Sequence, residues 1–144
     1  MDSVTYHDNG QIRFQGEYRN GLKEGAHYTY DPDGRVNLLV TWQNDVENGP
    51  FEYYHSNGVM SSNGTFKDGV RDGSQTRYFE NREIQAMMEY ADGELSGLYT
   101  RNSAPGVPML VGEYFIGPDG ESVQCGIWIQ NGTALDAGVP CPPR

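Results

Sequence analysis

The stretch Gly16-Glu17-Tyr18-Arg19-Asn20-Gly21 decides the fold, because its elements return at a constant spacing along the chain. Three series of residues, two of large rings and one of glycines, advance in equal steps of 24 residues. Their members are Tyr18, Trp42, Phe66, Tyr90 and Tyr114; Tyr6, Tyr30, Tyr54 and Tyr78; and Gly25, Gly49, Gly73 and Gly97. A fixed period of this size indicates a stacked repeat array rather than a globular enzyme core.

Each repeat is predicted to be one β-hairpin. Ile12, Phe14 and Tyr18 alternate with polar residues, and this period of two is typical of a strand. Asn20-Gly21 then supplies two residues that tolerate positive φ, which is the strongest short hairpin signal. The chain returns toward Tyr30, where the next copy begins.

A chain of 144 residues has the length of about one domain, and we predict a single domain over 1–144. The period sets the boundaries of the copies within it. The copies are 6–30, 30–54, 54–78, 78–102 and a partial 102–120, followed by a C-terminal cap and tail over 121–144. In the fourth copy, Ile84, Met87, Met88 and Ala91 also match helical spacing. We predict a strand there, because Tyr78, Tyr90 and Gly97 keep the register. The expected fold is an all-β, elongated, single-layer antiparallel sheet.

The charge of the chain restricts its partners. A formal net charge of −10 repels nucleic acid and anionic membrane surfaces and favours a protein partner with a basic surface. The sequence contains no apolar run long enough to span a bilayer and no signal segment. We expect a cytoplasmic protein if Met1 is the native start and a periplasmic one if a leader was removed. The sequence does not indicate an oligomeric state.

Cys125 and Cys141 are the only cysteines. A disulfide between them would close a loop of about 15 residues and stabilise the fold by about 3 kcal/mol in an oxidising compartment. Two free thiols in a cytosolic protein are the alternative, and both interpretations stay open. The sequence lacks the four spaced ligands of a structural zinc site.

Catalysis is the function class with the least support. The sequence contains no nucleophile elbow, phosphate-binding loop or zinc-protease motif. His7 and His55 share one register but lie two copies apart, too far to share a metal ion. We therefore predict a protein that is not an enzyme, with no catalytic residues, cofactor or metal.

The repeat resembles the MORN-repeat variant family, whose bacterial members include YwqK-type antitoxins. The shared pattern, Gly-x-Tyr-x-Asn-Gly-x-x-x-Gly, runs from Gly16 to Gly25, again from Gly64 to Gly73, and less fully from Tyr90 to Gly97. The resemblance covers roughly residues 6 to 120. It implies a curved antiparallel sheet that binds another protein, and an antitoxin or immunity protein that covers the active site of a cognate bacterial toxin or secreted effector. A scaffold or envelope-associated assembly protein is the alternative.

Partner-binding residues are predicted on the odd-numbered face, which the first copy makes polar. Apolar residues that break this pattern are Leu39, Phe51, Tyr53, Met87, Tyr99, Val111 and Phe115. Carboxylates on the turns, predicted to form an acidic rim, are Asp45, Glu47, Asp68, Asp72, Asp92 and Glu94. Apolar groups on a solvated face indicate a binding patch with a polar rim. Two alternatives remain: the C-terminal segment covers the odd face, or twisting of the sheet buries both sides.

Overall fold

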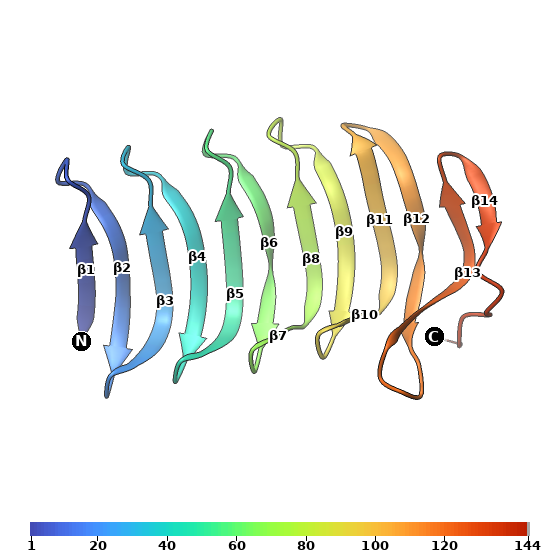
Figure 1. The fold of residues 1–144 in the computed structure, drawn as a ribbon, viewed down its shortest axis with the longest axis horizontal. Coiled ribbons are helices and arrows are strands. Elements are labelled where there is room, and N and C mark those ends of the chain that lie inside the picture. Colours follow the sequence, from blue (N-terminus) through green and yellow to red (C-terminus); the bar gives the residue numbers. More distant parts are fainter. Residues whose placement is uncertain (144) are drawn as a thin grey trace. The chain divides into compact units, whose positions relative to one another are not determined.

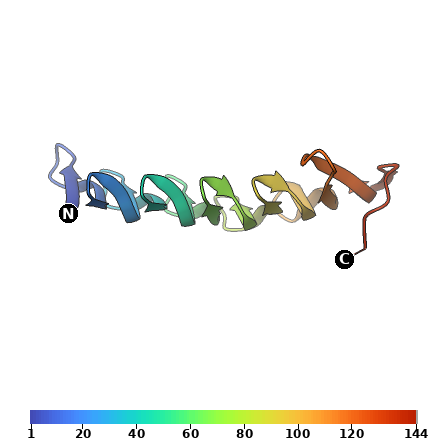
Figure 2. The same cartoon turned by 90° about the horizontal axis from the view of Figure 1, so that it is seen from below.

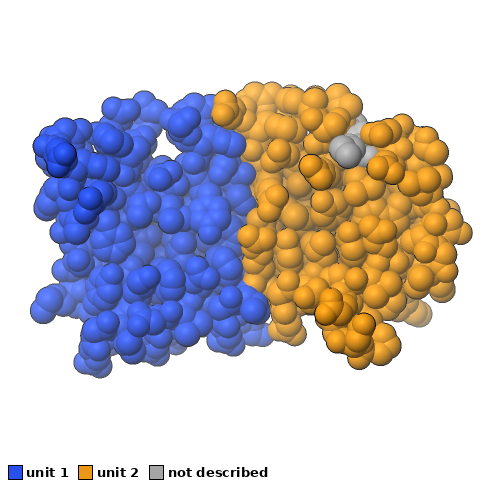
Figure 3. Space-filling model, viewed as in Figure 1, with its two compact units in different colours: residues 1–70 blue, residues 71–144 orange. Residues whose placement is uncertain are grey.

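Strands and the turns between them make up the fold of the described residues. The computed structural model describes residues 1–143, apart from the side chains of Pro108 and Met109, and within this range no residue is helical. The described part of the chain therefore has no helix able to cross a bilayer. The chain divides into two compact units, Met1–Val70 (unit 1) and Arg71–Arg144 (unit 2), which Figure 3 shows in different colours.

Apart from two strands of two residues each, the strands of each unit follow one another in chain order, and each is antiparallel to its neighbours (Figure 1). The strands of unit 1 are β1 (Asp2–Tyr6), β2 (Ile12–Arg19), β3 (Leu22–Tyr30), β4 (Val36–Gln43), β5 (Val46–Tyr54) and β6 (Met60–Lys67). A short β7 (Val70–Arg71) spans the boundary. The strands of unit 2 are β8 (Gly73–Tyr78), β9 (Ile84–Ala91), β10 (Glu94–Leu95), β11 (Gly97–Ala104), β12 (Val107–Ile116), β13 (Ser122–Gln130) and β14 (Thr133–Asp136). Seen edge-on in Figure 2, the strands of each unit form a single layer. The prediction of an all-β, open antiparallel array of hairpins is confirmed.

The two-residue turns have the backbone that their residues favour. Asn20 and Gly21 have φ angles of 52° and 78°, and two successive positive values match the right-handed twist of the strands that they join. The same pair of positive φ angles occurs at Asn44-Asp45, Asp68-Gly69, Asp92-Gly93 and Asn131-Gly132. Local turn chemistry therefore accounts for these reversals.

The fourth copy is a strand, as the repeat register predicts. Its segment Ile84–Ala91 forms β9 and pairs with β8 from Gly73↔Tyr90 to Tyr78↔Ile84. Helical propensity is a weak preference that neighbouring strands override, because they supply hydrogen bonds along both edges of this segment.

The reversals change which residue numbers face the core. Across the Asn20-Gly21 turn, Arg19 lies opposite Leu22 and Phe14 lies opposite Thr29. Opposite residues of an antiparallel pair point to the same face of the sheet. Even-numbered residues of β2 therefore share a face with odd-numbered residues of β3, and the next reversal restores even numbers on β4.

The core of each unit is one row of side chains that crosses its strands. The row is Gly16, His27, Val40, Phe51 and Gly64 in unit 1, and Gln75, Met88, Tyr99, Gly112 and Trp128 in unit 2. Most of its members are buried, including Phe51, which is 1% exposed. We call the side that carries this row the core face of each unit and the opposite side its outer face.

Aromatic rings pack around this row. The ring centroid of His27 lies 5.5 Å from that of Phe14, 5.3 Å from that of Tyr18 and 6.2 Å from that of Trp42. In unit 2 the rings of Tyr99, Tyr114 and Trp128 lie 5.1 to 6.0 Å apart. Such ring pairs stabilise a thin sheet beyond the apolar area that they bury.

The last hairpin begins five residues later than the period predicts, because Trp128 follows Gly112 by 16 residues whereas His27 follows Gly16 by 11. The chain reverses between β12 and β13 through 117–121, where the Gly117 amide donates to the Glu121 carbonyl at 2.9 Å. The Asp31 amide makes the same bond to the Arg35 carbonyl, so this longer turn is one that the repeat already uses elsewhere. Trp128 then packs over Gly112 as His27 packs over Gly16.

Candidate functional site

The predicted odd-numbered patch is divided between two faces in each unit. In unit 1, Phe51 lies opposite Val40 and Tyr53 lies opposite Leu38, so both are on the core face. Leu39 lies opposite Glu52 on the outer face. The prediction that Leu39, Phe51 and Tyr53 share an exposed face is wrong, because each two-residue turn exchanges odd and even numbers.

Phe51 is a core residue. Its ring lies 4.7 Å from that of Phe66 and 5.2 Å from that of Tyr53, measured between centroids, and almost none of its surface reaches solvent. Leu39 is half-buried beside Tyr28 and Glu52. A partner therefore has no access to the phenyl ring of Phe51.

The predicted residues of unit 2 are also divided. Tyr99 lies on the core face, opposite Gly112 and beside Trp128. Met87 lies on the outer face, opposite Thr76 and Thr100, and is 47% exposed. Phe115 lies on the outer face opposite Val123.

Residues that the sequence interpretation missed complete the outer face of unit 2. Leu98 is 53% exposed and Ile127 is 68% exposed, and each follows a glycine with positive φ and precedes a core ring. In earlier copies this position holds Ala26, Pro50 or Ser74. Comparison of the residue after each such glycine would have shown the change from small or polar to large and apolar.

The six carboxylates of the predicted rim lie at or beside two-residue turns, but several are engaged in local hydrogen bonds. Asp45 accepts a bond from the Lys23 amide at 2.6 Å, and Asp72 accepts one from the Asp92 amide at 3.3 Å. Glu94 accepts one from the Ser122 hydroxyl at 3.0 Å. These three side chains join neighbouring strands and turns. The remaining members of the rim are Glu47, Asp68 and Asp92, of which Asp68 and Asp92 are exposed.

The two cysteines form a disulfide that holds the C-terminal tail against the outer face of unit 2. Cys125 and Cys141 have Cα atoms 4.9 Å apart, and the Gly126 amide donates to the Val139 carbonyl at 2.7 Å. Pro142 and Pro143 line a small hollow together with Glu113 and Phe115. The tail therefore covers the part of the outer face that includes Phe115, which is one of the two alternatives that the sequence left open.

The Glu113 carboxylate and the sulfurs of Cys125 and Cys141 lie within 4.8 Å of one another. Because the two sulfurs are bonded to each other, they do not offer the thiolates that a metal ion would require. The closeness of these oxygen and sulfur atoms therefore follows from the Cys125–Cys141 disulfide bond.

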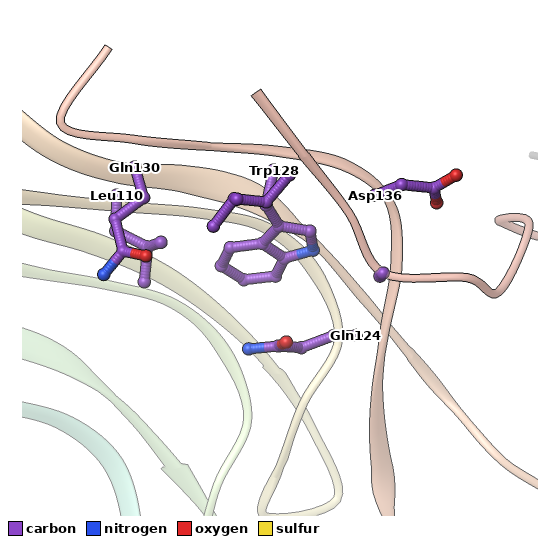
Figure 4. A pocket seen from close by; sticks show the side chains of 7 residues that line it. Leu110, Gln124, Trp128, Gln130 and Asp136 are labelled. Atoms are coloured by element: carbon purple, nitrogen blue, oxygen red, sulfur yellow. The ribbon is translucent and has the colours of Figure 1, made fainter. Parts of the chain in front are cut away.

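A hollow of about 470 Å³ opens on the core face of unit 2, between β12, β13 and β14 (Figure 4). Gln124 and Gln130 contribute amides. Asp136 is the one ionisable residue among the described residues of its lining, and its carboxylate points away from Trp128 (Figure 4). The Trp128 indole is only 3% exposed, so it cannot stack on a bound ring. The Asp136 carboxylate accepts a bond from the Gly138 amide at 2.8 Å. This hollow lacks the pair of groups that acid–base or nucleophilic catalysis needs.

Tyr54 carries a perturbed ionisation on the outer face of unit 1. Its hydroxyl donates to Glu52 at 2.5 Å, and this bond, together with burial and the carboxylate charge, raises the pKa of Tyr54 from 10.0 to about 12. A raised pKa stabilises the fold below the unfolded value of 10.0, and this contribution is lost as the pH rises through about 12.

We expect Tyr54 to ionise in the folded protein near pH 12. The difference in absorbance at about 295 nm between the wild type and Tyr54→Phe isolates its titration, while circular dichroism reports that the fold persists. Glu52→Gln removes the acceptor charge and should move this midpoint downward. A midpoint near pH 10 in the wild type would show that the hydrogen bond does not hold the proton.

The comparison with protein families finds the MORN repeat variant. Its model matches residues 2–20 and 47–68, and these matches cover the neighbouring strands β1 and β2, and then β5 and β6. No curated protein matches the chain. The matches support a MORN-repeat family and, with it, a protein-binding or scaffold role. MORN-repeat proteins are generally scaffolds without catalysis.

Proposed function

We propose that this chain is a protein-binding module that neutralises a cognate bacterial toxin or secreted effector by covering its active site. The observation that carries the proposal is the exposed apolar surface of Met87, Leu98 and Ile127 on the outer face of unit 2. A sheet that exposes large apolar side chains among polar ones is suited to docking another protein. The MORN-repeat match supports the same class of function.

The proposed mechanism is steric. An open antiparallel sheet offers a broad, preformed surface, so binding orders few of its own residues and loses little conformational entropy. A partner whose catalytic groups meet this surface loses access to its substrate. The net charge of −10 would speed the encounter with a basic partner.

The Cys125–Cys141 disulfide supports an encounter in an oxidising compartment. There the bond persists and keeps the tail attached to the outer face. A thiol titration of the folded protein, purified without reductant, should detect no free thiol. Two reactive thiols would favour a reducing compartment.

The experiment that tests the proposed function uses the product of the neighbouring gene. Its expression alone should arrest growth, co-expression of this chain should restore growth, and the two proteins should elute together in size-exclusion chromatography. An unrelated acidic β-protein of similar size serves as the control for a nonspecific effect of charge. A complex with a harmless neighbour would instead support the scaffold role, and a toxic neighbour that this chain neither binds nor neutralises would exclude the proposed pairing.

A further inference from the structure

The apolar side chains on the outer face of unit 2 gather in one place, which we call the Leu98 patch. It consists of Met87 on β9, Leu98 on β11, Val111 on β12, and Ile127 and Ile129 on β13. Thr100 lies opposite both Met87 and Val111, and Val111 lies opposite Ile129, so these side chains adjoin one another across four strands. Leu98, Val111, Ile127 and Ile129 also line a shallow hollow of about 270 Å³.

The patch is flanked by carboxylates. Glu113 lies opposite Leu98 on β12, where it is half-buried and lines both the hollow of the patch and the hollow that Pro142 and Pro143 line. On the other side of β11, the Glu89 carbonyl accepts a bond from the Ser96 amide at 2.9 Å, and this places Glu89 next to the start of β11. Leu98 therefore lies between two acidic residues of neighbouring strands.

Strand register separates the charges of unit 2 by sign. On β8, β9, β11, β12 and β13, the charged residues of the outer face are Glu89 and Glu113, and those of the core face are Arg77 and Arg101. Arg77 and Arg101 are both paired with Ala86 of the core face, which confirms their side. A ligand on the Leu98 patch thus meets apolar surface and negative charge.

We propose that the Leu98 patch docks a cationic amphipathic element of the partner protein, with apolar side chains in the hollow and Lys or Arg side chains against Glu89 and Glu113. This inference rests on the proposed function and assigns its surface and the chemistry of its partner. A second copy of this chain does not fit, because two outer faces in contact would oppose like carboxylates on molecules that each carry a charge of −10. Anionic lipid is disfavoured by the same repulsion.

The patch is suited to such an element by its geometry. A helix with an apolar stripe places its basic residues along both edges of that stripe, which is the arrangement that binds an apolar groove with acidic borders. The large apolar residues at 98 and 127 replace the small or polar residues that the earlier copies place after their positive-φ glycines. Exposed Leu98 and Ile127 contribute little to the core, so polar substitutions there should leave the fold intact.

The test measures the affinity of the full chain for synthetic helical peptides by fluorescence anisotropy. The probe is an amphipathic peptide of leucine and lysine. The comparison probes are the same peptide with glutamate in place of lysine, and a scrambled leucine–lysine peptide with no apolar stripe. We expect the first probe to bind, with an affinity that falls at high salt, and the other two to bind at least about tenfold more weakly.

Two pairs of substitutions separate the apolar and the charged contributions. Leu98→Ser with Ile127→Ser should weaken binding of the first probe by about tenfold or more. Val46→Ser, at an apolar residue of unit 1 that is 42% exposed, is the matched control and should not change it. Glu89→Gln with Glu113→Gln should lower the affinity and reduce its salt dependence, whereas Glu83→Gln with Glu121→Gln removes the same charge from turns and should have a smaller effect.

The proposal is overturned if the leucine–lysine peptide does not bind, if the glutamate peptide binds as well, or if Leu98→Ser with Ile127→Ser behaves like Val46→Ser. Thermal melts of each variant verify that the fold is retained. Growth protection by the wild-type chain is an independent result. Protection that survives loss of the Leu98 patch would move the docking surface elsewhere and leave the proposed function standing, whereas absence of any protection would remove the proposed function and leave the peptide result unchanged.

Discussion

Phe51→Ala is expected to lower the free energy of unfolding of unit 1 by about 3–5 kcal/mol. The phenyl ring is 1% exposed and packs against Phe66 and Tyr53, so its removal opens a cavity in a layer only one sheet thick. Such a layer has few other side chains that could move to fill the space. Urea unfolding followed by tryptophan fluorescence measures the loss, since Trp42 lies in unit 1.

Pro50→Ala is the matched control, because Pro50 neighbours Phe51 on β5 and is exposed. Its effect should stay within about 0.5 kcal/mol, as is usual for surface positions. Hydrogen exchange would show whether the loss of protection is confined to unit 1. A Phe51→Ala protein as stable as the wild type would mean that the ring is not part of the core, and it would restore Phe51 as a candidate contact for a partner.

Gly112→Ala is expected to destabilise unit 2 by about 3 kcal/mol. A methyl group at this position would overlap the indole ring of Trp128, whose Nε1 donates to the Cys125 carbonyl at 3.1 Å and holds the ring in place. The φ angle of Gly112 is not in the left-handed region, so the effect is purely steric. Circular dichroism during urea unfolding provides the measurement, and this signal does not depend on the presence of Trp128.

A double-mutant cycle tests the cause of this loss. In a Trp128→Leu background the methyl group has space, so adding Gly112→Ala should then cost less than about 1 kcal/mol. Equal costs in both backgrounds would show that the methyl group does not act through the indole ring. Gly16→Ala should behave in the same way in unit 1, where the new Cβ would lie 2.6 Å from Cγ of His27.

The outer-face patch shows how far residue counting carries and where it fails. The sequence alone identified Met87, Val111 and Phe115 as apolar residues of one face, and the structure places all three on the outer face, where the C-terminal tail covers Phe115. Residue counting wrongly added Phe51, Tyr53 and Tyr99. Each two-residue turn, at Asn20-Gly21 and its equivalents, exchanges odd and even numbers between the two faces, so one parity does not mark one face over successive strands.

The sequence by itself determined the repeat, its hairpins and its turns. The 24-residue period can be read directly from the order of the residues. The alternation of apolar residues and the positive-φ turn residues act over a few neighbouring positions. Tertiary structure alone decided which side chains face the core, since this depends on the register accumulated over successive turns and bulges. It also decided the joining of Cys125 to Cys141 and the gathering of Leu98, Val111 and Ile127, which come from different strands and meet only when those strands pair.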